Sequence, residues 1–248
     1  MITKALILAA GLGSRLQPLT EHQPKSLVEV NHKAILHHQL ISLAAVGITE
    51  CVIAIGHKGA VIKDQYGSKY ESINLHYIEN PLFATTNNIY SLYLLKDHFN
   101  QACLLLEGDV LVEDSILQDL ISNEASNIAV VDHIKAEPNG TILFADSNRV
   151  TKMVLKEDQS KLSDIESALK TVNIYKFSKT MLLDHLSPLL EKAISEGHNN
   201  IFYESMLAEI INKNAIAVAP MVVSQNKWVE IDNHEDLIEA QNIFSELH

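Results

Sequence analysis

The chain has 248 residues, of which 47% are hydrophobic, and its formal net charge is -12 at neutral pH. This length supports one large α/β domain or two small ones, and the apolar fraction supports a full core. The acidic balance argues against nucleic acid or an anionic membrane surface as a partner, although local cations can still hold a small anion. No apolar run reaches the roughly 18 residues of a membrane span.

The thiols and the first residues of the chain predict a cytoplasmic location. Cys51 and Cys103 each lie in an apolar, strand-like run, which favours buried free thiols. Lys4 is the only charge before the first apolar run, and no small-residue cleavage site follows, so this segment does not fit a signal peptide.

In the first half of the chain, short apolar runs alternate with helical patterns. The runs at 4–9, 50–55, 73–79, 102–109 and 127–133 are expected to be strands. Helices are expected at 34–46, from Asn87 or Asn88 to about His98, and after the fourth strand. This alternation predicts a parallel sheet covered by helices on both faces.

The second half has a different pattern. TILFAD and RVTKMVLK predict a hairpin that turns at residues 146–148, and KTVNIYKF predicts a strand at 170–177. Helices at 178–196 and 202–213, strands in AIAVAPMVV and KWVEID, and a closing helix at 234–247 follow. Without repeats or a linker, the chain is expected to form one domain with an inserted substrate lobe.

In the stretch ALILAAGLGSRLQPLT, residues 5–20, an apolar strand is followed by a loop that contains two glycines. Gly11 and Gly13 permit a close approach of backbone N–H groups to a phosphate, but a plain structural turn explains them equally well. The G-x-G-x-x-G pattern fails at Leu16, and no Walker pattern occurs. Arg15 and Lys25 favour the phosphate interpretation, since each contact at about 4 Å is worth roughly 4 kcal/mol before desolvation.

LILAAGLGSRLQPLTEHQPKSLVEV resembles the signature of the nucleotidyltransferases that activate sugar phosphates and phospho-alcohols, G-x-G-x-R followed by P-K. The matching positions are Gly11, Gly13, Arg15, Pro24 and Lys25. The likeness continues in EGD at 107–109, in KTVNIYKF and in WVEIDNHEDL. It implies a Rossmann-like, mostly parallel sheet sandwiched by helices, with a small inserted hairpin and helical lobe. It also implies a single domain, 1–248, with a nucleotide-binding part at about 1–133 and an acceptor-binding lobe at about 134–226.

The resemblance implies a reaction in which a phosphate oxygen of the acceptor attacks the α-phosphorus of a nucleoside triphosphate. The attacking oxygen is already ionised near neutral pH, so the reaction needs positioning and charge neutralisation and no general base. Arg15 and Lys25 would hold the triphosphate. Lys156, in MVLKED, resembles the family's second lysine, which reaches the attacking phosphate, but its surroundings lack the E-K-P pattern and a solvated lysine is an alternative.

The same likeness implies the nucleotide contacts and the metal ligands. The expected nucleotide-binding residues are Leu8, Ala9, Ala10, Gly11, Gly13, Ser14, Arg15, Lys25, Thr86, Asn87, Asn88, Glu107 and Gly108. Asp109 and Asp232 match the aspartates that hold Mg²⁺, an ion that takes one or two carboxylates plus substrate phosphates. Both aspartates, and the residues from Thr86 to Asn88, could instead be helix caps.

ENPLFATTNNIYSLYLL and IFYESML resemble the branch that makes CDP-linked head groups such as phosphocholine. The expected acceptor-binding residues are Asn173, Tyr203, Glu204, Trp228 and Glu230, because an amino or choline group is bound by aromatic faces and carboxylates. Packing of Tyr203 and Trp228 inside the lobe is the alternative.

The resulting hypothesis is a Mg²⁺-dependent cytidylyltransferase that uses CTP and a small phosphorylated or phosphonylated acceptor, with phosphocholine first. 2-Aminoethylphosphonate, a phospho-amino acid or a sugar 1-phosphate are the alternative acceptors. A regulatory nucleotide-binding module without activity and a plain NAD-binding domain are further alternatives. The first would lack a lysine or metal aspartate, and the second is disfavoured by Leu16 and the P-K element. A monomer or homodimer is expected.

Overall fold

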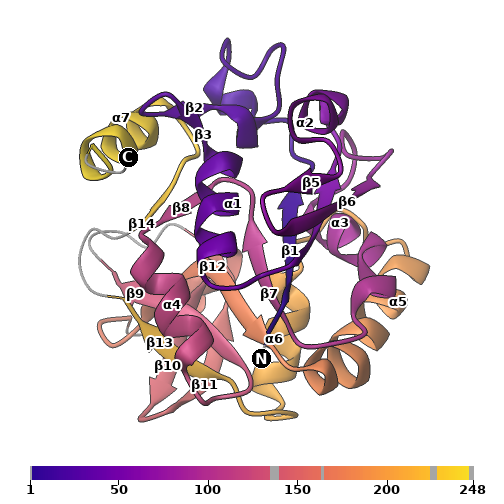
Figure 1. The fold of residues 1–248 in the computed structure, drawn as a ribbon. Coiled ribbons are helices and arrows are strands. Elements are labelled where there is room, and N and C mark those ends of the chain that lie inside the picture. Colours follow the sequence, from indigo (N-terminus) through magenta and orange to yellow (C-terminus); the bar gives the residue numbers. More distant parts are fainter. Residues whose placement is uncertain (1, 135–139, 163–164, 224–227, 246–248) are drawn as a thin grey trace.

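The computed structural model describes residues 2–134, 140–162, 165–223 and 228–245. Within these residues the main sheet has ten strands: β1 (Lys4–Ala9), β4 (Glu50–Ile55), β5 (Lys69–Tyr70), β6 (Ile73–Glu79), β7 (Cys103–Glu107), β9 (Ile128–His133), β10 (Ile142–Asp146), β11 (Arg149–Val154), β12 (Leu169–Phe177) and β13 (Ala219–Val222). The fold is mixed α/β, with a central, mostly parallel sheet flanked by helices (Figure 1).

Four parallel strands, in the order β7, β1, β4 and β6, form the centre of the sheet. Leu6 of β1 pairs with Val52 of β4 on one side and with Leu105 of β7 on the other. Every residue of β1 is buried, as expected for a strand with both faces covered. β12 runs antiparallel to β7 and connects this centre to β9 and to the β10–β11 hairpin.

Helices cover both faces of the sheet. They are α1 (Ile35–Ala45), α2 (Gly59–Tyr66), α3 (Asn88–Leu94), α4 (Asp114–Ser122), α5 (Ser187–Ser195), α6 (Glu204–Asn212) and α7 (His234–Ile243). α1, α2 and α4 bury one face, where Ile7 and Ile53 lie. α3, α5 and α6 bury the other, where Leu6 and Val52 lie (Figure 1). Alternate residues of each central strand therefore contribute to two separate apolar layers.

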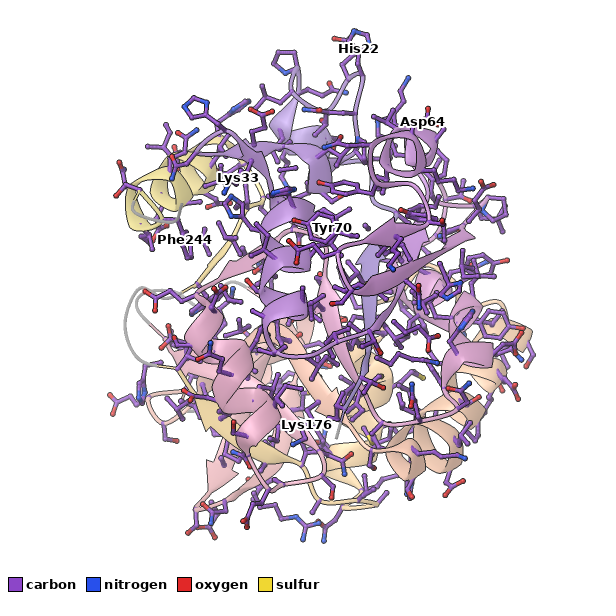
Figure 2. The ribbon with its side chains drawn as sticks, in the orientation of Figure 1. His22, Lys33, Asp64, Tyr70, Lys176 and Phe244 are labelled. Atoms are coloured by element: carbon purple, nitrogen blue, oxygen red, sulfur yellow. The ribbon has the colours of Figure 1, made fainter. Side chains whose placement is uncertain are left out.

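A third apolar cluster joins the two ends of the chain. β8 (Val110–Val112) pairs antiparallel with β14 (Trp228–Glu230), and β2 (Glu29–Val30) pairs with β3 (Lys33–Ala34). Phe244, just after α7, is buried in this cluster (Figure 2). This packing holds the C-terminal segment beside the loop that follows β1.

The predicted strands and helices are present, with some different boundaries. The strand expected at 102–109 ends at Glu107, and the chain turns before β8 leaves the main sheet to pair with β14. The helix expected at 178–196 divides into a π-helical turn, Met181–Leu186, and α5, where Pro188 cannot donate a backbone hydrogen bond. The closing helix ends at Ile243, and part of its expected range, 246–247, lies outside the described residues. Helix α2 was not predicted.

Cys51 and Cys103 are buried free thiols, as predicted. Of the helices in the described part of the chain, none is both long and apolar enough to cross a membrane. The division into a nucleotide-binding part and an acceptor-binding lobe stays a prediction, and residues 135–139, 163–164 and 224–226 of that lobe lie outside the described ranges.

Candidate active site

The glycine loop leaves the carboxyl end of β1 and folds back on itself. Gly13 has a φ of +63°, and a Cβ there would lie 3.0 Å from the Cβ of Lys25, so a side chain would be both strained and crowded. A Cβ at Gly11 would meet no protein atom within 4 Å, which leaves its backbone open to a ligand. The hydroxyl of Thr20 donates a hydrogen bond to the carbonyl of Gly13 over 2.8 Å. The loop therefore brings Lys25 directly against Gly13.

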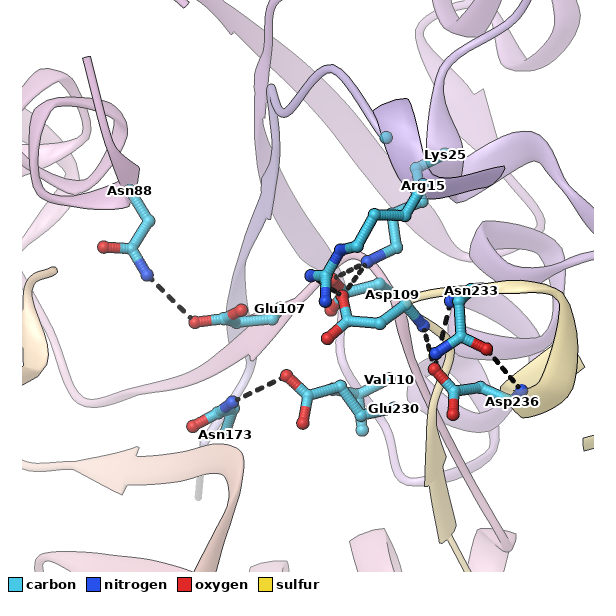
Figure 3. A network of polar contacts seen from close by, with 12 residues as sticks. Arg15, Lys25, Asn88, Glu107, Asp109, Val110, Asn173, Glu230, Asn233 and Asp236 are labelled. Atoms are coloured by element: carbon cyan, nitrogen blue, oxygen red, sulfur yellow. Dashed lines mark hydrogen bonds and ion pairs between the residues drawn. The ribbon is translucent and has the colours of Figure 1, made fainter. Parts of the chain in front are cut away.

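Two cations from this loop meet two aspartates from distant parts of the chain. The Nζ of Lys25 lies 2.6 Å from Oδ2 of Asp109 and 2.7 Å from Oδ1 of Asp232. The Nη2 of Arg15 lies 2.8 Å from the same Asp232 oxygen. Figure 3 shows Arg15 and Lys25 converging above Asp109. We call these four residues the cation–aspartate cluster.

The backbone around Asp109 is fixed from two sides. Nε2 of Gln39, a buried residue of α1, donates to the carbonyls of Glu107 and Val110, both over 2.8 Å. The N–H of Ile231 donates to the carbonyl of Asp109 over 2.9 Å. These bonds hold the turn between β7 and β8 in place.

Asp232 is anchored by the start of α7. The N–H groups of Asp232 and Asn233 donate to Oδ2 of Asp236, over 2.8 and 3.0 Å (Figure 3). The side chain of Asn233 in turn caps the helix by accepting from the N–H groups of Glu235 and Asp236. A capping box of this kind fixes the entry into a helix, and here it also fixes a carboxylate of the cluster.

The contacts in the cluster favour the charged forms of Lys25 and Asp232. Burial lowers the pKa of Lys25, but Asp109 and Asp232 outweigh it and raise that pKa above its usual range. Burial raises the pKa of Asp232, and Lys25 and Arg15 together bring it below its usual value. Each charge thus depends on its partners.

The donor set fits a divalent ion that shares its coordination with a substrate. Oδ1 of Asp109 is buried without a hydrogen-bond partner, while its Oδ2 holds Lys25. Within the described residues, no group of three or more His, Cys, Asp or Glu side chains could enclose a metal. Two carboxylates with substrate oxygens completing the shell are typical of Mg²⁺.

A cavity of about 520 Å³ opens over the cluster. It is lined by nearly all the residues predicted from the sequence: Leu8, Ala9, Ala10, Gly11, Gly13, Ser14, Arg15, Lys25, Thr86, Asn87, Asn88, Glu107, Gly108, Asp109, Lys156, Asn173, Glu204, Glu230 and Asp232. Lys156 enters it from the start of a 3-10 helical segment, Lys156–Lys161. The structure therefore brings the predicted nucleotide, metal and most acceptor residues into one space.

The other end of the cavity contains three largely buried carboxylates, Glu107, Glu204 and Glu230, which we call the glutamate triad. Burial, reinforced by the charge of Glu204, raises the pKa of Glu107 well above its usual value. Burial raises the pKa of Glu204 to about 7. Burial also raises the pKa of Glu230, although its partner Lys170, 2.8 Å away, opposes the change.

Asn88 connects two members of the triad. Its Nδ2 donates to Glu107 over 3.2 Å and to Glu204 over 3.3 Å, and its Oδ1 accepts from the N–H of Tyr203 over 2.9 Å. Asn87 caps α3 by accepting from the N–H of Asn88. These asparagines were expected to be either helix caps or nucleotide contacts. In the structure Asn87 caps the helix, and Asn88 faces the cavity.

Tyr203 and Trp228 do not line the cavity. Tyr203 is fully buried, with its ring edge-on to that of Tyr175, in the apolar layer under α6. The ring of Trp228 lies 4.7 Å from the Nζ of Lys170, and its indole N–H donates to Asp132 over 2.9 Å. Trp228 thus touches the residue that holds Glu230 and does not face the acceptor space itself.

The sequence did not single out the rings that do line the cavity, Phe83 and Phe202. Phe202 precedes the buried Tyr203, and it is 47% exposed. Only the position at which α6 begins decides which of these two adjacent rings faces outward. Gln39 and Lys170 contact the site residues Glu107 and Glu230, and neither belongs to a motif that would have identified it from the sequence.

The nucleotidyl transferase family matches residues 4–246 of this chain. The chain is 33% identical, over 98% of its length, to CMP-5'-(3-aminopropyl)phosphonate synthase from Streptomyces rubellomurinus, and it spans 39% of that protein. It is 28% identical to CTP:phosphoglutamine cytidylyltransferase from Campylobacter jejuni, over 94% of this chain and 97% of that protein.

The solved structure of CTP:phosphocholine cytidylyltransferase from Streptococcus pneumoniae matches with a TM-score of 0.80 and 25% identity, over 98% of this chain and 100% of that one. The family match covers the glycine loop, both aspartates and the glutamate triad. The chain therefore belongs to the nucleotidyl transferase family.

Proposed function

We propose that this chain is a Mg²⁺-dependent cytidylyltransferase that transfers CMP from CTP to a small phosphorylated or phosphonylated acceptor. The observation that carries this proposal is the cation–aspartate cluster beside an open glycine loop in one cavity. A triphosphate needs cations for its oxygens, and a divalent ion needs carboxylates, and both are present here within direct contact.

The proposed reaction forms one bond and breaks one. An ionised oxygen of the acceptor attacks the α-phosphorus of CTP in line, and the bond from that phosphorus to the bridging oxygen breaks to release pyrophosphate. Arg15 and Lys25 bind the triphosphate and stabilise the charge that grows on pyrophosphate. Lys156, from the other side of the cavity, contacts the attacking phosphate. The open backbone at Gly11 binds phosphate oxygens through N–H groups.

Mg²⁺ would be held by Asp109 and Asp232, and when bound it supplies charge neutralisation at the phosphates. Asp109 contributes the buried oxygen that has no hydrogen-bond partner. Asp232 contributes a carboxylate whose position the capping box fixes.

The relatives support CTP as the nucleotide and widen the set of acceptors. Phosphocholine was the first acceptor expected from the sequence resemblance, and the pneumococcal relative is named for it. Two other relatives are named for an aminopropylphosphonate and for phosphoglutamine. A cytoplasmic location and a monomeric or homodimeric state stay predictions.

Pyrophosphate release should be measured for CTP, ATP, GTP and UTP with each of phosphocholine, phosphoethanolamine, 2-aminoethylphosphonate, phosphoglutamine and glucose 1-phosphate. We expect turnover with CTP and at least one of the nitrogen-containing acceptors, and its loss when Mg²⁺ is removed with a chelator. The proposal would be contradicted if only glucose 1-phosphate were turned over. It would also be contradicted if none of the four nucleotides were turned over.

A further inference from the structure

We propose that the acceptor of this enzyme carries a primary ammonium group, which the glutamate triad and the amide oxygen of Asn173 bind in preference to a trimethylammonium group. This inference rests on the proposed function and specifies the acceptor end of the same cavity. It follows from the unbalanced charge there, from an unpartnered buried acceptor and from the position of the aromatic rings.

The charges at the two ends of the cavity are balanced differently. Lys25 and Arg15 pair with the aspartates, and Lys170 pairs with Glu230. Among the described residues, no lysine or arginine forms an ion pair with Glu107 or Glu204, although the amide of Asn88 donates a hydrogen bond to each. Burial without a cation disfavours the ionised form of both carboxylates, and a cationic ligand would stabilise that form.

Asn173 supplies an independent observation. It lies in β12 with a φ of 60°, lines the cavity and is only 8% exposed. Its Nδ2 donates to Glu230 over 3.4 Å, whereas its Oδ1 is buried without a hydrogen-bond partner. A buried amide oxygen left unpaired is unfavourable, and a hydrogen-bond donor on the ligand would satisfy it.

The available donors and rings distinguish the two kinds of cation. A primary ammonium has three N–H donors, which match the carboxylates and the amide oxygen. A trimethylammonium group has none and is typically bound by aromatic faces. Tyr203 is buried and the ring of Trp228 is covered by Lys170, so that of the described aromatic side chains only Phe83 and Phe202 line the cavity. Figure 3 shows polar groups at this end, with Asn88 meeting Glu107 and Asn173 meeting Glu230.

Three acceptors that differ only at the nitrogen test the inference: phosphoethanolamine, phosphocholine and ethyl phosphate, each with CTP and Mg²⁺. We expect kcat/KM for phosphoethanolamine to exceed that for phosphocholine by about tenfold or more, and that for ethyl phosphate by about a hundredfold. Equal or higher values for phosphocholine, or an ethyl phosphate value equal to that of phosphoethanolamine, would overturn the inference while leaving the cytidylyltransferase proposal intact.

The variant Glu204→Gln keeps the shape of the side chain and removes its charge. It should lower kcat/KM for phosphoethanolamine by about tenfold or more and change that for ethyl phosphate little, because only the first carries a cation. Glu191→Gln, which removes an exposed carboxylate paired with Lys96, is the matched control and should change neither. A parallel loss for both acceptors in Glu204→Gln would indicate a structural role and contradict the proposed contact.

Calorimetric titration of the same acceptors into the intact enzyme separates the two proposals. If no acceptor is turned over, the proposed function fails, and the binding data still decide the inference. Tighter binding of phosphoethanolamine than of phosphocholine would support it, and equal binding, weaker binding or no binding of phosphoethanolamine would reject it.

Discussion

The two ends of the cavity, the cation–aspartate cluster and the glutamate triad, differ in how their charges are paired. In the cation–aspartate cluster every charge has a partner within 2.8 Å, and the positive groups come from one short loop. In the glutamate triad Asn88 donates to Glu107 and Glu204, and of the three carboxylates only Glu230 has an ion pair within the described residues. The charges of the first end are paired without a ligand, whereas the second end would gain a further positive charge from a cationic ligand. This difference is consistent with the proposals that the first end binds phosphate and that the second binds the nitrogen of the acceptor.

The largest effect is expected at the cluster. Lys25→Ala removes the cation that touches both aspartates, and kcat should fall about a thousandfold because charge on the leaving pyrophosphate loses a preorganised partner. Pyrophosphate release measures the rate, and circular dichroism should show an unchanged fold. Lys213→Ala, which breaks an exposed ion pair with Glu209, is the control. A comparable loss in the control, or a rate near the parent's in Lys25→Ala, would contradict this role.

Removal of one metal carboxylate should have the next largest effect. Asp109→Asn should lower kcat about a hundredfold and raise the Mg²⁺ concentration needed for half-maximal rate, because one of two protein carboxylates is lost. A Mg²⁺ titration of the rate provides the measurement. An unchanged Mg²⁺ requirement would show that Asp109 binds no metal. Asp114→Asn, outside the cavity, serves as the comparison.

The glutamate end should give a pH dependence that the cluster does not. Below about pH 7 Glu204 is protonated, so an ammonium ligand meets less negative charge, and above it the carboxylate is ionised. Burial raises the pKa of Glu204, the hydrogen bond from Asn88 opposes this, and the charges of Glu230 and Glu157 raise it further. The ratio of kcat/KM for phosphoethanolamine to that for ethyl phosphate should therefore rise, by about tenfold between about pH 6 and about pH 8.

The ammonium of phosphoethanolamine lowers the pKa of its phosphate relative to that of ethyl phosphate, and this difference is the same in the parent enzyme and in Glu204→Gln, so the two enzymes are compared at each pH. In Glu204→Gln the ratio should lose most of its pH dependence, since the titrating group is gone. If the ratio of the two kcat/KM values in the parent enzyme showed the same pH dependence as in Glu204→Gln, Glu204 would not contact the nitrogen of the acceptor.

The smallest effect is expected at Trp228, which acts through Lys170. Trp228→Leu removes the ring beneath that ammonium, and the KM for phosphoethanolamine should rise about threefold with little change in kcat. Tyr93→Leu removes a similar ring from Lys96, away from the cavity, and should leave both constants unchanged. An unchanged KM for phosphoethanolamine in Trp228→Leu would show that Trp228 has no role in acceptor binding.

The sequence predicts the cluster end better than the triad end, for a physical reason. Gly13, Arg15 and Lys25 lie close together in the sequence, and the turn between them constrains their spacing. This spacing can therefore be recognised as a sequence motif. The triad comes from β7, α6 and β14, and its assembly depends on packing between distant elements. Tyr203 and Phe202 illustrate the limit, because neighbours in sequence face opposite sides and only the start of α6 decides which ring is buried.

The fold was predictable where the apolar period is strong, as in β1 and β4, and less so where pairing partners lie far away. ACLLLEGD, residues 102–109, was expected to be one strand with an acidic end. Pairing of β8 with β14, more than a hundred residues later, draws the chain out of the sheet and creates the turn that carries Asp109.

The capping box at the start of α7 has a consequence for how the site is assembled during synthesis. The loop that carries Arg15 and Lys25 is made before the carboxylate that both of them touch, which follows Lys25 by 207 residues, and the residues that anchor that carboxylate are made later still. A ribosome-bound chain therefore holds Arg15 and Lys25 without this partner until the start of α7 has been made. Assembly of the proposed nucleotide site thus depends on synthesis of α7.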